Sequence, residues 1–332
     1  MLMFLQTTWF FLIGFLLAFH IVLDGMNLGA AAWHLFSKSE KNRKAVIESV
    51  GPFWDGNEVW LLAGGGALFA AFPKAYAVVF SVLYIPMTLL LLALITRAVS
   101  VEVRSKIQNE KWRSTWDAVF SIASLAVILL LGVAFGNVIR GLPMDDSINT
   151  VKSFAGMLNP FALLTGITAL VMVSIQGAIF TALRTDGEIK RISMKRAVAA
   201  WPIYLALYLA LMIWSLTMNA HLADNYIRIP ALWLLPVLAL ALMIILFYNL
   251  KKGRIFPALL ASSAAIIIHL FGAGMAVFPR IATLTIYDSS SSEKTLGIML
   301  VIAMIGIPLA FIYTVYVFRK IKGWESPEKS TY

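Results

Sequence analysis

Four ionisable residues lie within or beside long apolar stretches of the N-terminal third of the chain: Asp24, Asp55, Glu58 and Arg97. A charged side chain inside a bilayer costs several kcal/mol unless it is paired or hydrated, so these residues are the first candidates for function. Asp55 and Glu58 are three residues apart and therefore share a helix face. We expect the four residues to reach a similar depth and to form a polar cluster that conducts protons or contacts a second subunit.

Structural explanations compete with this functional one. Asp55 and Glu58 fall at the expected start of a helix, where the helix dipole favours carboxylates. Asp24 could form a packing salt bridge with Arg97. The sequence alone does not separate these roles from proton conduction or subunit contact.

Haem ligation is the second chemistry to consider. The chain has four histidines and no cysteine, which excludes thiolate iron ligands and iron–sulfur clusters. Only His20 and His269 fall inside expected membrane spans, which leaves one haem between them as a candidate metal site. His34 is expected at the cytoplasmic edge, in contact with solvent. No other metal-ligand cluster, phosphate-binding glycine loop or nucleophile triad is found.

The elements that must position these residues are transmembrane helices. Of the 332 residues, 60% are hydrophobic and 13% are charged, a balance typical of a chain solvated by lipid. A helix needs about 20 apolar residues to cross a bilayer. The sequence predicts an all-α integral membrane protein in which residues 1–332 form a single membrane domain with about nine spans, at 8–32, 53–72, 77–97, 117–138, 160–183, 198–218, 230–250, 257–278 and 296–318.

The net charge of +10 sets the expected orientation and does not indicate a nucleic-acid partner. When successive loops are assigned to alternate sides, the large majority of the 27 lysines and arginines fall on one side. By the positive-inside rule that side is cytoplasmic. The N-terminus is therefore predicted outside and the C-terminus in the cytoplasm, which requires an odd number of spans.

A long motif carries a family resemblance. Residues 51–61, GPFWDGNEVWL, and residues 63–73, AGGGALFAAFP, resemble the signature of subunit II of cytochrome bd-type quinol oxidases. Supporting segments follow in the family's order along nearly the whole chain, among them 23–29 (LDGMNLG), 132–137 (GVAFGN), 159–161 (NPF) and 176–178 (QGA).

The resemblance implies a heterodimeric oxidase in the bacterial cell membrane that oxidises quinol and reduces dioxygen to water. It places two b haems, one d haem and most of the quinol site on subunit I, so this chain would bind no cofactor alone. Membrane lipid would surround the complex, and the sequence leaves open whether a small single-span subunit also attaches. A self-sufficient b-type cytochrome and a secondary transporter remain the alternatives.

Individual positions carry this resemblance further. Asp24, Trp54, Asp55 and Arg97 match family positions linked to assembly or to a proton path at the subunit interface. At position 58 some members have glutamine where this chain has glutamate. Asn27 replaces the family's second aspartate in the segment that begins at Asp24, which weakens any proton route that needs a carboxylate there.

Overall fold

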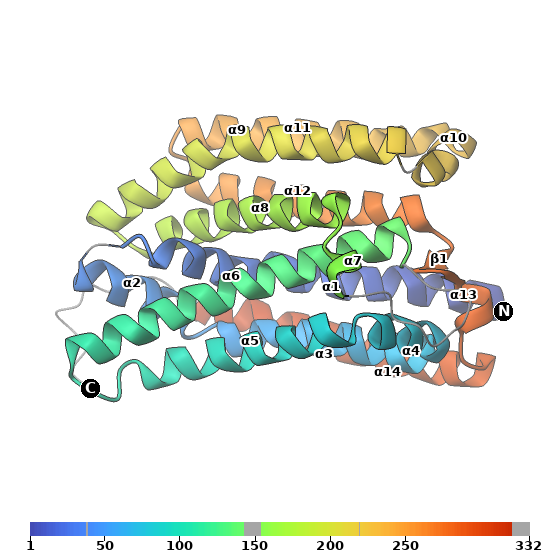
Figure 1. Ribbon diagram of the computed structural model, residues 1–332, viewed down its shortest axis with the longest axis horizontal. Helices are drawn as coiled ribbons and strands as arrows, with labels where there is room; N and C mark the ends of the chain where they lie inside the picture. The colour runs from blue at the N-terminus through green and yellow to red at the C-terminus, as the bar shows by residue number, and fades with distance from the viewer. Residues whose placement is uncertain (38, 143–153, 219, 321–332) are drawn as a thin grey trace.

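The computed structural model describes residues 1–37, 39–142, 154–218 and 220–320, and the expected charges at Lys38, Lys152, Lys322 and Lys329 lie outside this part. Figure 1 shows long helices running side by side along the longest axis of the molecule. These are α1 (Leu2–His34), α3 (Trp54–Ala71), α5 (Tyr84–Val103), α6 (Glu110–Arg140), α8 (Pro160–Arg184), α9 (Gly187–Met218), α11 (Leu234–Lys251), α12 (Ile255–Val277) and α14 (Glu293–Lys320).

Shorter elements connect the long helices. They are α2 (Glu40–Val50), α4 (Pro73–Val82), α7 (Phe154–Met157), η1 (Ala220–Ala223), α10 (Asp224–Arg228), η2 (Pro230–Trp233), β1 (Arg280–Ile281), β2 (Leu284–Thr285) and α13 (Ile286–Ser289). The two strands pair antiparallel, with Arg280 opposite Thr285. Figure 1 places α2 near one end of the molecule, and the N-terminus, α10 and α13 at the other end.

The expected count of about nine spans is confirmed. In the described residues, eight helices are each long and apolar enough to cross a membrane, and α3 with α4 forms a further pair bent by 119°. The expected third span was placed too early, because residues 73–82 form the separate helix α4 and α5 begins only at Tyr84. Pro86 explains the break, since a proline in a continuous helix would clash with the carbonyl of Val82 four residues before it.

Helix α1 packs against α3, α6, α8, α12 and α14, so it lies at the centre of the bundle. Its closest neighbour is α8, where a Cβ added to Gly29 would lie 1.9 Å from the carbonyl oxygen of Val173, and one added to Gly177 would lie 2.0 Å from the nitrogen of Ala30. The two backbones therefore touch at this crossing, which only glycine permits. Such close approach at small residues is typical of helix packing in membranes.

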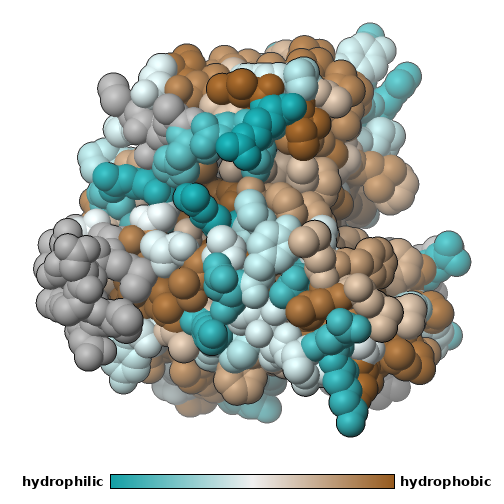
Figure 2. Space-filling model, turned by 90° about the vertical axis from the view of Figure 1, so that its right-hand side faces the viewer, coloured by the Kyte–Doolittle hydropathy of each residue, from teal (hydrophilic) through white to brown (hydrophobic). Residues whose placement is uncertain are grey.

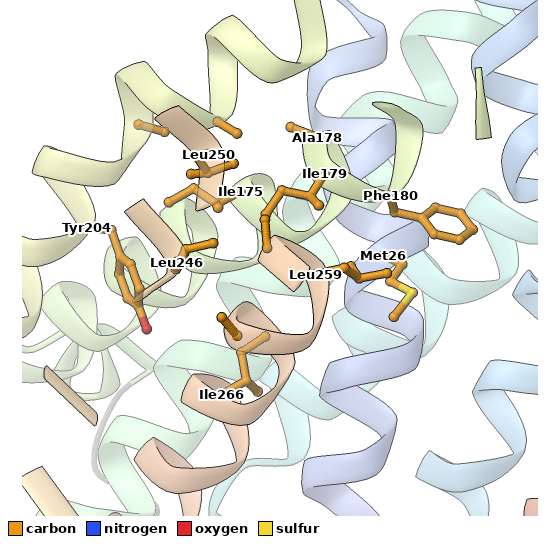
Figure 3. Close-up of a cluster of buried hydrophobic side chains, with 14 of the residues drawn as sticks. Met26, Ile175, Ala178, Ile179, Phe180, Tyr204, Leu246, Leu250, Leu259 and Ile266 are labelled. Carbon is orange, nitrogen blue, oxygen red and sulfur yellow. The ribbon is translucent and has the colours of Figure 1, made fainter. Parts of the chain in front are cut away.

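A buried hydrophobic cluster fills the space between α1, α8, α9, α11 and α12. Figure 3 shows Ile175 and Ile179 of α8 among Leu246, Leu259 and Ile266 of the neighbouring helices. Figure 2 views the end of the molecule that carries the N-terminus, where hydrophilic residues gather over the middle and hydrophobic ones flank them. The polar ends and apolar sides are those expected of a membrane-spanning bundle.

A buried charge network between α1, α3 and α5

Three of the four ionisable residues singled out in the sequence meet in the structure. Arg97 of α5 donates from Nη1 to both carboxylate oxygens of Asp24 of α1, at 3.1 and 3.0 Å. Its Nη2 donates to the Glu58 carboxylate of α3. The side chains of Arg97 and Asp24 are 2% and 0% exposed, whereas that of Glu58 is 22% exposed. The network therefore runs from the centre of the bundle to its surface.

Amide and imidazole groups surround this network. Asn27 donates to the Asp24 carboxylate at 3.2 Å, one helical turn along α1. Asn57 of α3 donates to the carbonyl oxygen of Leu23 at 3.0 Å, which fixes α3 against α1. His20 lies 3.3 Å from the carbonyl oxygen of Asn57 through Nδ1. Asn27 thus keeps a contact with Asp24 although it carries no charge of its own.

The structure does not bring Asp55 and Trp54 into this network. Asp55 is exposed in the first turn of α3. Trp54 is half-buried and packs against a cluster that includes Val46 and Val50 of α2. Asp55 and Glu58 share a helix face as expected, but within the described residues only Glu58 turns far enough inward to meet Arg97.

The structure also contains a second charge network, which the sequence did not predict. His34 at the end of α1 lies 2.6 Å through Nε2 from Asp117 of α6, and its side chain is fully buried. The expectation that His34 contacts solvent is therefore wrong. The reason is that α2 folds over the end of the bundle and, with Phe120 of α6, encloses the imidazole.

Arginine side chains complete this second network. Arg104, just after α5, donates from Nε and Nη2 to the two carboxylate oxygens of Asp117, and from Nη2 to Glu40 of α2 at 3.1 Å. Arg43 of α2 lies 3.5 Å from Asp117. Burial opposes the charge of Arg104, but its hydrogen bonds and its attraction to Asp117 and Glu40 raise the pKa of the guanidinium, so it stays a cation. The hydrophobic pattern of the sequence gives no sign of this second network, because the network joins residues 34–43 to residues 104–117.

The two candidate haem ligands contact different helices. His20 faces α3, whereas His269 of α12 lies 3.2 Å through Nδ1 from the hydroxyl of Tyr204 of α9 and packs edge-on against Tyr208. His269 lines a largely apolar cavity of about 240 Å³ between α6, α8, α9, α11 and α12. Among the described residues no group of three or more histidine, aspartate or glutamate side chains is placed to hold a metal ion. A haem held between His20 and His269 therefore stays a prediction, since these contacts place each imidazole beside its own neighbours and not beside the other histidine.

The Asp24–Arg97–Glu58 network has a net charge that one bound proton neutralises. Two carboxylates share one guanidinium, so the group is neutral when it holds one proton and carries one negative charge when it holds none. A net charge is expensive in a bilayer, which favours a bound proton. Glu58 is partly exposed, so the network is open at the surface of α3 and not sealed inside the bundle.

Comparisons with known proteins add to this geometry. Residues 5–321 match the sequence profile of the family described as cytochrome bd terminal oxidase subunit II. The chain is 32% identical to cytochrome bd-I ubiquinol oxidase subunit 2 of Escherichia coli, over 96% of this chain and 94% of the relative. It is also 32% identical to cytochrome bd ubiquinol oxidase subunit 2 of Bacillus subtilis, over 97% of this chain and 98% of the relative.

A solved structure shares the fold. A chain in the structure of bd oxidase from Geobacillus thermodenitrificans superposes with a TM-score of 0.80, covering 95% of this chain and 98% of that chain at 17% identity. At this identity the match concerns the fold alone. None of these similarities favours a secondary transporter or a self-sufficient b-type cytochrome.

Proposed function

Since the chain belongs to the cytochrome bd terminal oxidase subunit II family, we propose that it is the partner and scaffold of the haem-bearing subunit of a quinol oxidase and that its buried charge network passes protons from the cytoplasm. The complex is an oxidoreductase of a bacterial membrane. The two b haems, the d haem and most of the quinol site would lie on subunit I. Lipid, and in some complexes a small single-span subunit, would complete the surroundings.

The observation that carries the proton role is the Asp24–Arg97–Glu58 network. Reduction of dioxygen to water consumes protons as well as electrons, so a site buried in the membrane needs groups that deliver them. A carboxylate that exchanges one proton while an arginine holds its charge near neutral meets that need. In this proposal Asp24 and Glu58 carry the proton, and Arg97 keeps them in place.

The scaffold role rests on the surface beside this network. Glu58 is partly exposed and Asp55 is exposed on α3, and a Cβ added to Gly65 or Gly66 of the same helix would meet nothing within 4 Å. Carboxylates at the lipid-facing surface of a bundle are costly, whereas small residues allow another helix to approach closely. We propose that this face of α3 contacts subunit I and that Trp54 and Asp55 contribute to assembly.

Substitution within the intact complex tests the proton role. Asp24→Asn and Glu58→Gln are expected to slow quinol-driven oxygen consumption by about 100-fold or more, the usual scale for loss of a proton-transfer group. Asp288→Asn, in the short helix α13, is the control and should leave turnover unchanged, because this carboxylate bonds only to Thr285 among the described residues. Normal assembly with normal turnover in both Asp24→Asn and Glu58→Gln would rule out a required proton role.

The scaffold role needs a separate measurement. An affinity tag on this chain should recover a haem-bearing partner, and redox difference spectra should assign the haem signal to the complex. The same spectra taken on this chain after the partner is removed should show no haem. Haem retained by the isolated chain would contradict the assignment of all haems to subunit I.

A further inference from the structure

The two charge networks are linked by a line of buried polar side chains on α1, α5 and α6. Asp117, Ser121 and Ser124 follow one another on α6 at spacings of four and three residues, so they share one face of that helix. Asp117 bonds to both His34 of α1 and Arg104 after α5, so this face looks between α1 and α5. Ser121 and Ser124 are both fully buried.

Contacts between these helices fix their relative depth. Helix α6 runs antiparallel to α1 and to α5, since His34 and Arg104 meet Asp117 at one end while Leu28 and Leu90 pack with Ile128 further along. A helix rises 1.5 Å per residue, so equal steps inward from the His34–Asp117 and Arg104–Asp117 contacts reach similar depths. Four residues inward from Arg104 and Asp117 lie Ser100 and Ser121. Seven residues inward from His34, Arg104 and Asp117 lie Asn27, Arg97 and Ser124. The second of these levels is about 10 Å from the His34–Asp117 contact.

Several polar atoms at these levels have no partner among the described residues. They are the hydroxyls of Ser121 and Ser124, Oδ1 of Asn27, Nε of Arg97 and Nδ1 of His34. Several other hydroxyls of the bundle donate within their own helix, as Ser100 does to the carbonyl of Arg97 and Thr165 to that of Phe161. A buried polar atom without a partner costs about 1–3 kcal/mol, and ordered water is the usual remedy.

From this arrangement we propose that Ser121, Ser124 and Asn27 hold a file of ordered water that carries protons from the His34–Asp117 pair to the Asp24–Arg97–Glu58 network. The proposal rests on the proton role proposed above and names its entrance and its route. Each proton leaves the His34–Asp117 pair, passes between waters along hydrogen bonds and ends on Asp24 or Glu58. Only O–H bonds, and the N–H bond of His34 where the imidazole gives up the proton, form or break. The serines and Asn27 act as positioning residues that keep the water in line.

The residues at the entrance suit this use. Asp117 is faced by His34, Arg104 and Arg43, and Arg104 and Arg113 are faced by Glu40. These pairings hold the cations against carboxylates, which lowers the electrostatic barrier that unpaired arginines would raise against a proton. Glu40 is half-exposed, so the network reaches solvent at the end of the molecule where α2 lies.

A pair of nearly isosteric variants tests the route in the intact oxidase. Ser124→Thr keeps a hydroxyl at the file, whereas Ser124→Val has the same shape without it. We expect Ser124→Val to slow proton uptake from the α2 side by about tenfold, less than the roughly 100-fold for loss of a proton-transfer group itself, because Ser124 only positions water. Ser124→Thr should remain near the wild-type rate. A larger solvent deuterium isotope effect in the valine variant would mark the slow step as proton transfer. Density for water beside Ser121, Ser124 and Asn27 in a high-resolution map of the complex is the independent readout.

The other outcomes are decisive as well. Wild-type rates in both variants, with Asp24→Asn slow, would overturn the water file and leave the proposed proton role standing. Wild-type rates in Asp24→Asn and Glu58→Gln as well would overturn both the water file and the proposed proton role. Equal slowing by valine and threonine would show a packing effect and overturn the file. If neither Ser124 variant assembles, the double variant Ser121→Ala/Ser124→Ala provides the test. Unchanged proton uptake in this double variant would contradict the water file.

Discussion

At the scale of single residues, the decisive feature is that the buried charges of the two networks are all paired. Arg97 holds two carboxylates and Asp117 holds three basic groups. Removal of one partner from a buried pair leaves an uncompensated charge, which costs more than the pair itself contributes. The two networks therefore differ from the exposed ion pairs on the same chain, which solvent screens.

Arg97 provides a test that separates structure from proton transfer. Arg97→Gln alone should reduce the yield of assembled complex sharply, because Asp24 is then buried without its cation, a loss of about 3–5 kcal/mol. Arg97→Gln combined with Asp24→Asn should recover much of that yield, since two neutral amides can bond to each other. Quinol-driven turnover should stay low in the double variant. Size-exclusion yield and oxygen consumption measure the two effects, and turnover restored together with yield would show that Asp24 matters only for packing.

Asp117 should matter for stability far more than an exposed aspartate. Asp117→Asn weakens contacts to His34, Arg104 and Arg43 and should lower the thermal midpoint of the purified complex clearly, consistent with a loss of about 3–5 kcal/mol. Asp186→Asn is the matched control, since the side chain of Asp186 is 86% exposed in its pair with Lys190 and should contribute less than about 1 kcal/mol. Similar midpoints for the two variants would show that the Asp117 network is weak.

At the scale of helices, the crossing of α1 and α8 fixes the centre of the fold. Gly29→Ala or Gly177→Ala should prevent the two backbones from touching and abolish or strongly reduce the folded complex. Gly14→Ala in the same helix α1 meets nothing within 4 Å and should be neutral or slightly stabilising, because alanine favours a helix over glycine by about 1 kcal/mol. The amount of detergent-stable complex measures the difference. Equal yields for Gly14→Ala and Gly29→Ala would mean that the crossing tolerates separation.

Much of the helical framework could be predicted from hydropathy and proline positions, while the contacts between helices could not. The expected spans reproduce α8 and α12 closely, because proline and charge mark their ends. The break between α4 and α5 was missed because residues 75–96 carry no charge and read as one continuous apolar stretch. His34, Asp117 and Arg104 were missed as a group because their contact depends on how α2 folds over the bundle. Asp24 and Arg97 were paired correctly because each is an isolated charge in an apolar span.

At the scale of the whole molecule, the orientation in the membrane is still a prediction, and the absence of cysteine makes it testable. Single cysteines at Lys111 and Lys251, on the predicted cytoplasmic side, should react with an impermeant maleimide only after the cells are opened. Cysteines at Arg228 and Lys294 should react in intact cells. The wild-type chain gives the background, since it has no thiol of its own. The reverse labelling pattern would invert the topology and the direction of proton entry.

The contact of α1 with α8 also dictates an order of events during biosynthesis. Helix α1 leaves the ribosome first, but the helix that closes against Gly29 is made only after α3, α5 and α6. Before α8 is made, the small residues of α1 have no helix packed against them. Asp24 has no cation beside it until Arg97 of α5 has been made. We therefore expect a nascent chain that stops before α8 to leave the glycine face of α1 unpacked and to be degraded by membrane quality-control proteases. A chain that includes α8 can pack this face and complete the centre of the bundle.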